Sequence, residues 1–191
     1  MTSPKLIAVA IASLLATSAF ALSSAEHKAE SDRIEAHYKS SKEQCKSLSG
    51  NLKDVCEEEA KGQKKVSKAA LDYRAEPSEK HRYELEKAKA DAAYEVAKEK
   101  CDDLKGNAED ICEKDAKAQH VRALEAAKVA QAITSTNKEG QAKAAHVSEV
   151  RKDAAEHVRE ADYKAAKEKC DALAGDVKDQ CINDAKRIFG Q

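Results

Sequence analysis

The residues most able to carry chemistry in this 191-residue chain are its six cysteines, which form three pairs of equal spacing. Each pair reads Cys-x10-Cys; the pairs are Cys45 and Cys56, Cys101 and Cys112, and Cys170 and Cys181. Zinc sites usually place about two to four residues between paired cysteines, so this spacing disfavours a metal centre. Neither C-x-x-C nor C-x-x-C-H occurs, which disfavours thioredoxin-type redox chemistry and haem attachment. The pattern favours structural disulfides.

The remaining candidates for chemistry are histidines and tyrosines. His146 and His157 lie eleven residues apart on one expected helical face. At about 1.5 Å rise per residue their rings would be about 16 Å apart, too far to share one ion. We therefore predict exposed histidines, no metal and no cofactor. Each repeat also carries one tyrosine at the same position, which either packs between helices or takes part in an interaction: Tyr38, Tyr94 and Tyr163.

The segments around the cysteines predict the elements that position them. Tyr94, Ala97, Cys101 and Leu104 follow one another at steps of three, four and three, which is one face of a helix. A glycine soon after this face is a typical helix end, and the Asn or Asp behind it is a typical N-cap for a second helix. The sequence therefore predicts helix, minimal turn, helix. The turns are Gly50-Asn51, Gly106-Asn107 and Gly175-Asp176.

The position of the cysteines relative to the turn predicts how they pair. In each repeat one cysteine lies five residues before the glycine and the other lies five residues after the capping residue. In a hairpin both would stand at the same height, about 7 to 8 Å from the turn, whereas one continuous helix would separate them by about 16 Å. A disulfide needs Cα atoms within about 7 Å. We therefore predict three disulfides, each within one repeat and each contributing about 3 kcal/mol.

Helix-breaking and turn-forming residues along the chain predict an all-α fold of three antiparallel helical hairpins in tandem. The expected arms are residues 25–49, 52–72, 79–105, 108–133, 141–174 and 177–188, with a break at Pro77 and a loop over 134–140. The corresponding units are residues 22–76, 77–137 and 138–191. Whether the hairpins gather into one bundle or form an extended string is left open at this point.

The first 21 residues predict a secretory signal peptide. One lysine precedes an apolar stretch from Leu6 to Phe20, and cleavage is expected after Ala21 or Ala25. The apolar stretch is shorter than the roughly 20 residues of a spanning helix, so no membrane span is expected after cleavage. Disulfides persist outside the cytosol, which agrees with export. We predict a periplasmic or secreted protein.

Charge and composition narrow the classes of function. The formal net charge is −1, and basic and acidic residues are interleaved, which disfavours nucleic acid as a partner. Leu, Ile, Val and Phe are scarce and alanine is abundant, so the helices have little apolar area to bury. No nucleophile elbow, phosphate-binding loop or convergent acid–base set is visible, and we predict that the chain is not an enzyme.

The repeat motif carries a resemblance. The segment from Tyr94 to Cys112, together with the ending Ala185-Lys-Arg-Ile-Phe-Gly, resembles a family of small exported bacterial proteins with Cys-x10-Cys helical repeats, often labelled cell envelope biogenesis protein TolA. The resemblance implies a Gram-negative envelope setting and no particular activity.

The expected function is that of a non-enzymatic, envelope-associated structural or interaction protein whose partners are other envelope proteins. Two alternatives stay open: a periplasmic carrier of metal or a small ligand, and a stress-related, chaperone-like protein. The oligomeric state does not follow from the sequence.

Overall fold

The computed structural model describes residues 22–135 and 138–191, and these ranges contain six helices and no strand. The predicted signal peptide lies outside the described residues. The helices are α1 (Ser24–Cys45), α2 (Asn51–Ala75), α3 (Glu79–Cys101), α4 (Asn107–Thr134), α5 (Gly140–Cys170) and α6 (Gly175–Phe189). The predicted all-α fold of tandem stapled hairpins is confirmed.

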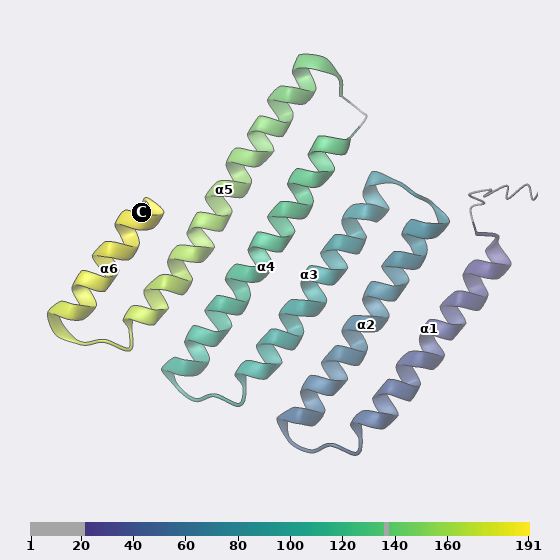
Figure 1. The fold of residues 1–191 in the computed structure, drawn as a ribbon, viewed down its shortest axis with the longest axis horizontal. Helices are drawn as coiled ribbons and strands as arrows, with labels where there is room; N and C mark the ends of the chain where they lie inside the picture. The colour runs from purple at the N-terminus through teal and green to yellow at the C-terminus, as the bar shows by residue number, and fades with distance from the viewer. Residues whose placement is uncertain (1–21, 136–137) are drawn as a thin grey trace, which may run out of the picture.

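The six helices lie side by side in a single antiparallel layer, in chain order from α1 to α6 (Figure 1). Within the described residues each helix contacts only its neighbours in the chain, both inside hairpins and from one hairpin to the next. The hairpins therefore form a continuous one-dimensional array rather than a closed bundle. In such an array each unit is stabilised by its immediate neighbours only.

The interior of the layer is built from small residues. The first cysteine of each pair is completely buried, and most of the other buried apolar side chains are alanines. Leu71 is the only leucine, isoleucine, valine or phenylalanine that is buried in the described part of the chain. A single layer can bury only the flanks of its helices, and small side chains on those flanks let the helices approach closely. The abundance of alanine in the sequence is explained by this packing.

A close approach between the first two hairpins involves Gly62 of α2. This residue is buried, and a Cβ atom placed on it would lie 2.8 Å from the Cβ of Ala92 in α3. Atoms do not approach so closely without displacement, so the α2–α3 contact requires a residue without a side chain at this position.

The helix ends differ from the predicted ones at all three hairpin turns. The first arm of each hairpin ends at its cysteine, and not four residues later as the steps of three and four suggested. The amide of the leucine three residues on donates to the cysteine carbonyl, for example Leu104 N–H to Cys101 O at 2.8 Å. This tight bend turns the chain toward the next arm. Five residues, 46–50 and 102–106, then connect the arms of the first two hairpins, because a minimal turn does not span two packed helices about 8 to 10 Å apart.

The predicted caps of the second arms are also wrong. Gly50 and Gly106 occupy the N-cap position with φ near +59° and +58°, and Asn51 and Asn107 are already the first helical residues. In the third hairpin Ala174 is the cap and Gly175 begins the helix, so Asp176 is not a cap either. The glycine takes this position because its positive φ reverses the chain without steric cost.

The predicted break at Pro77 is confirmed, since α2 ends at Ala75 and α3 begins at Glu79. Ser78 caps α3, and its hydroxyl accepts a hydrogen bond from His81 N–H at 3.1 Å.

None of the helices in the described ranges combines the length and hydrophobicity that a membrane crossing requires.

Candidate functional site

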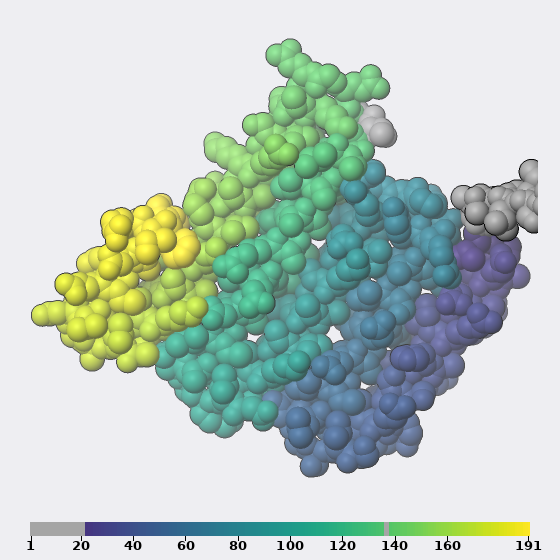
Figure 2. All heavy atoms as spheres, in the orientation of Figure 1, coloured from purple at the N-terminus to yellow at the C-terminus, as the bar shows by residue number. Residues whose placement is uncertain are grey.

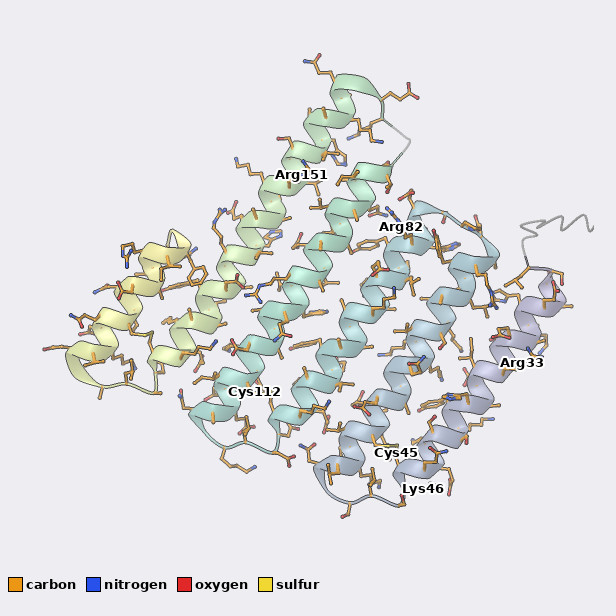
Figure 3. All side chains as sticks on the ribbon, viewed as in Figure 1. Arg33, Cys45, Lys46, Arg82, Cys112 and Arg151 are labelled. Atoms are coloured by element: carbon orange, nitrogen blue, oxygen red, sulfur yellow. A yellow bond between two sulfur atoms is a disulfide. The ribbon has the colours of Figure 1, made fainter. Side chains whose placement is uncertain are left out.

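The six cysteines are joined as predicted, in the pairs Cys45–Cys56, Cys101–Cys112 and Cys170–Cys181. The two Cα atoms are 5.6 Å apart in each pair. Figure 3 shows that the labelled Cys45 and Cys112 lie near the hairpin turns along one edge of the layer. No free thiol remains among the described residues. The cysteines therefore hold the hairpins closed and are not available as nucleophiles or metal ligands.

Tyr38, one of the three predicted interaction residues, is half-buried between α1 and α2. The ammonium group of Lys64 lies 4.3 Å from the centre of its ring, a cation–π contact. Lys64 also forms an ion pair with Glu35 at 3.3 Å. Hydrogen bonds from Lys68 and Lys64 hold the pKa of Glu35 below its ordinary value. Tyr38 thus belongs to a charged junction between the arms.

Tyr94 occupies the equivalent position 56 residues later, and the residue equivalent to Lys64 is His120. The two rings are stacked with centres 4.6 Å apart. His120 Nε2 lies 2.7 Å from Asp91 Oδ1, so a histidine–aspartate hydrogen bond takes the place of the lysine–glutamate ion pair of the first hairpin. Burial raises the pKa of Asp91, but hydrogen bonds from Lys87 and His120 outweigh it, so the pKa lies below its ordinary value.

Tyr163 completes the series, and it too is half-buried. The residue at the position of Lys64 and His120 is here Phe189, so the third hairpin has no cation at this point. Its carboxylate, Glu160, pairs instead with Lys164 of the same helix at 2.6 Å. The three tyrosines pack at the junctions between arms. An interaction role for them remains a prediction.

His146 and His157 do not form a common site. His157 Nδ1 lies 3.0 Å from Glu125 Oε1 of α4, and Glu125 also accepts a hydrogen bond from Lys128 at 2.7 Å. Burial raises the pKa of Glu125, but these two partners outweigh it and the pKa lies below its ordinary value. No group of three or more His, Cys, Asp or Glu side chains in the described residues is arranged to hold a metal ion.

The sequence reasoning missed a series of apolar grooves on one side of the layer. One groove of about 580 Å³ runs between α2 and α3, another of about 580 Å³ between α3 and α4, and a third of about 450 Å³ between α4 and α5. Ala93 lines both the first and the second groove, and Ala126 and Ala130 line both the second and the third. A residue shared by two grooves shows that they open on the same face.

We call this surface the groove face, and we define it by Val66, Ala93, Val96, Ala126, Ala130 and Val158. Ile133 of α4, which lines the third groove, is 42% exposed. The grooves are bordered by charges of both signs, such as Glu86 and Lys89 on α3. Figure 2 shows one of the two faces of the layer, on which the helices α1 to α6 form adjacent bands with no second layer of described chain over them.

The α4 part of the groove face has a sequence signal. Ala123, Ala126, Ala130 and Ile133 follow one another at steps of three, four and three, an apolar row like that of a helix that packs against a partner. Ala123, Ala126 and Ala130 are nevertheless exposed in the single layer. The row could have been found from the sequence, but its exposure could not.

No family model, curated protein or solved structure matches the chain. The groove face and the charged junctions must therefore be interpreted from their own geometry.

Proposed function

We propose that this chain is an exported, non-enzymatic interaction protein of the bacterial envelope, with the groove face as its binding surface. The setting rests on the resemblance of the repeat and on the leader-like first 21 residues. The three disulfides fit an extracytoplasmic protein, because such bonds persist in oxidising compartments.

The observation that carries the proposal is an apolar face left open on a highly charged protein. Charged residues make up 36% of the chain, yet the exposed row on α4 consists of alanines and Ile133. Contiguous exposed apolar surface bordered by polar residues is typical of protein interaction sites. The disulfides hold the hairpins in shape while this face is used, so binding does not require a large apolar core.

The same face favours the chaperone-like function as a second candidate. Open grooves lined by alanine and valine, such as Val66 and Val96, can accept apolar side chains of many sequences. The charged borders would keep a complex with an unfolded client in solution. This candidate differs from the first in the partner, not in the surface.

A pull-down from envelope extract under oxidising conditions tests the proposal, with Ala126→Glu as the face variant. Ala126 is exposed and glutamate is a good helix former, so the fold is expected to persist. Ala36→Glu on α1 is the matched control, since Ala36 is exposed and lines none of the described grooves. Specific partners are expected to be lost with Ala126→Glu and retained with Ala36→Glu. Identical sets of captured proteins for both variants would contradict the proposal.

An assay of client aggregation separates the two candidates. A chaperone-like protein suppresses the aggregation of a heat-denatured model client, and Ala126→Glu is expected to remove this effect. Stoichiometric capture of one or a few envelope proteins without suppression of aggregation would identify the interaction protein instead.

A further inference from the structure

The groove face lacks the second layer that packed helices usually have. Protein domains generally consist of two or more layers that bury the apolar sides of their elements against each other. Here every helix packs only sideways, against its neighbours in the chain, within the described residues. In residues 22–135 and 138–191, no other helix packs on the side chains of the α4 row across the face.

The two end helices of the layer carry exposed ion pairs. On α1 the side chains of Lys28 and Asp32 form an ion pair with each other and are 77% and 66% exposed. On α6 Arg187 and Asp184 form another pair, 74% and 64% exposed. Such solvated charges are typical of the terminal units of a helical array. The last helix, α6, also exposes Val177 and Ile188, which are 59% and 65% exposed, so the choice of the groove face rests on its grooves and not on the character of the ends.

We infer that the groove face binds the groove face of a second copy of this chain, which forms a two-fold symmetric dimer of two helical layers. The inference rests on the proposed function, because it names the partner of the same surface. In a two-fold interface both copies use the same surface. If one residue of the first copy contacts a second residue of the other copy, the reverse contact also forms, so the surface must be complementary to itself.

The size of the face is sufficient for a weak, reversible dimer. Four neighbouring helices, α2 to α5, are spaced about 8 to 10 Å apart, which gives a width of roughly 30 Å. The longest stretch of a helix that lines a groove runs over residues 82–93 on α3 and 122–133 on α4, or roughly 18 Å. The resulting flat footprint of roughly 540 Å² per copy is smaller than the about 800 Å² of accessible surface per partner in a standard interface, which agrees with a reversible dimer.

Contacts across the α3–α4 junction fix the register of these two helices. Arg82 donates a hydrogen bond to the carbonyl of Ala130 at 3.0 Å, and Asp91 pairs with His120 at 2.7 Å. Because the two helices are antiparallel, each step forward along α3 corresponds to an equal step backward along α4. It follows that the stretch between Glu86 and Lys89 on α3 is level with the stretch between Ala123 and Ala126 on α4.

We place the two-fold axis across the helices at this level, where it pairs the side chains nearest to it favourably. On α4, Ala123 of one copy meets Ala126 of the second copy, and two small side chains allow close approach of the helices. On α3, Glu86 of one copy meets Lys89 of the second copy, and the reverse pair forms on the other side of the axis. Glu86 and Lys89 already form an ion pair within each α3 at 2.8 Å, so the dimer brings together a neutral cluster of four charges. This charge arrangement is complementary to itself.

Sedimentation equilibrium of the purified, oxidised wild-type chain from about 1 to 100 µM tests the inference, and a reversible dimer is expected. Ala126→Glu is expected to raise the dimer Kd at least tenfold, and the control Ala36→Glu to leave it unchanged. Circular dichroism verifies that each variant stays helical. A wild-type chain that is monomeric throughout, or a dimer that Ala126→Glu does not weaken, overturns the inference.

Charge exchange tests the two-fold geometry itself. Glu86→Lys alone and Lys89→Glu alone each bring like charges together across the axis and are expected to weaken the dimer. The double variant restores opposite charges and is expected to recover the wild-type Kd. Failure of the double variant to recover it overturns the proposed axis.

The outcomes also separate this inference from the proposed function. A monomeric chain whose capture of an envelope protein still depends on Ala126 refutes the second copy and retains the interaction protein. If Ala126→Glu affects neither self-association nor capture, both proposals fail.

Discussion

Replacing Gly62 with alanine is expected to destabilise this protein, although the same change stabilises most helices. Alanine is favoured over glycine in a helix interior by about 1 kcal/mol. At this position, however, the new methyl group would lie 2.8 Å from the Cβ of Ala92 across the α2–α3 contact. Overpacking of this kind costs about 1 to 3 kcal/mol. The net loss of stability is therefore expected to be about 0 to 2 kcal/mol.

A double-mutant cycle isolates the contact. Ala92→Gly alone loses the helix preference of alanine, about 1 kcal/mol. The combination Gly62→Ala with Ala92→Gly moves one methyl group from α3 to α2, and its stability is expected to be close to that of the wild type. The two changes are then coupled by about 2 kcal/mol, which is within the range for residues in contact. Urea denaturation followed by circular dichroism measures all four proteins.

Gln63→Ala is the control, because Gln63 is the exposed neighbour of Gly62 and its replacement is expected to change stability by less than about 0.5 kcal/mol. The reasoning is refuted if Gly62→Ala stabilises the protein by about 1 kcal/mol, as it would in an open helix. Strict additivity of the two changes would also refute it, since it would show that the two helices do not touch there.

Three further predictions concern the disulfides, the α3–α4 junction and the N-cap of α1. Replacing Cys170 and Cys181 with alanine is expected to lower the free energy of unfolding by about 3 kcal/mol. It is also expected to raise amide exchange in α6, the shortest helix described. The equivalent change in the first hairpin is the control and is expected to leave α6 protected. The pKa of Asp91 is lowered in the folded state. The ionised carboxylate therefore stabilises the fold above about pH 4, and this contribution is lost as the pH falls through the folded-state pKa. In Asp91→Asn, the free energy of unfolding measured in urea is expected to fall less steeply at acid pH. Ser23 caps α1 in a reciprocal pair of hydrogen bonds with Glu26, and Ser23→Ala is expected to cost about 1 kcal/mol, visible as faster exchange in the first turn of α1.

Each of these has a result that contradicts it. Full protection of α6 without its disulfide would show that the helix does not depend on the staple. An unchanged acid profile in Asp91→Asn would show that this carboxylate does not govern stability at the α3–α4 junction. Unaltered exchange in Ser23→Ala would show that α1 begins without help from its cap.

The cap also bears on where the predicted signal peptide would be removed. Cleavage after Ala21 leaves Ser23 and its bonds to Glu26 in place, whereas cleavage after Ala25 removes the cap. Of the two sites that the sequence predicts, the first retains the helix start.

Much of the fold follows from the sequence because its signals are local. The hairpins and their disulfides depend on residues within one repeat of the chain, where the distance from cysteine to glycine determines which sulfurs can meet. The positions of the helix ends were less accurate. The steps of three and four continue to Leu104, but the bend after Cys101 uses the same spacing with i to i−3 bonds, so periodicity alone does not reveal the end of the helix.

The tertiary structure alone decided how the hairpins are arranged and which surface remains open. Alanine is compatible with a buried flank and with an exposed face, so the sequence does not state that Ala127 is buried while Ala126 is exposed. That distinction arises only when α3 and α5 take their places on either side of α4. The close contact of Gly62 with Ala92 likewise joins two hairpins that local signals treat as separate. Contacts between distant segments depend on the shape of both surfaces at once, and a pattern in one segment does not contain the shape of the other.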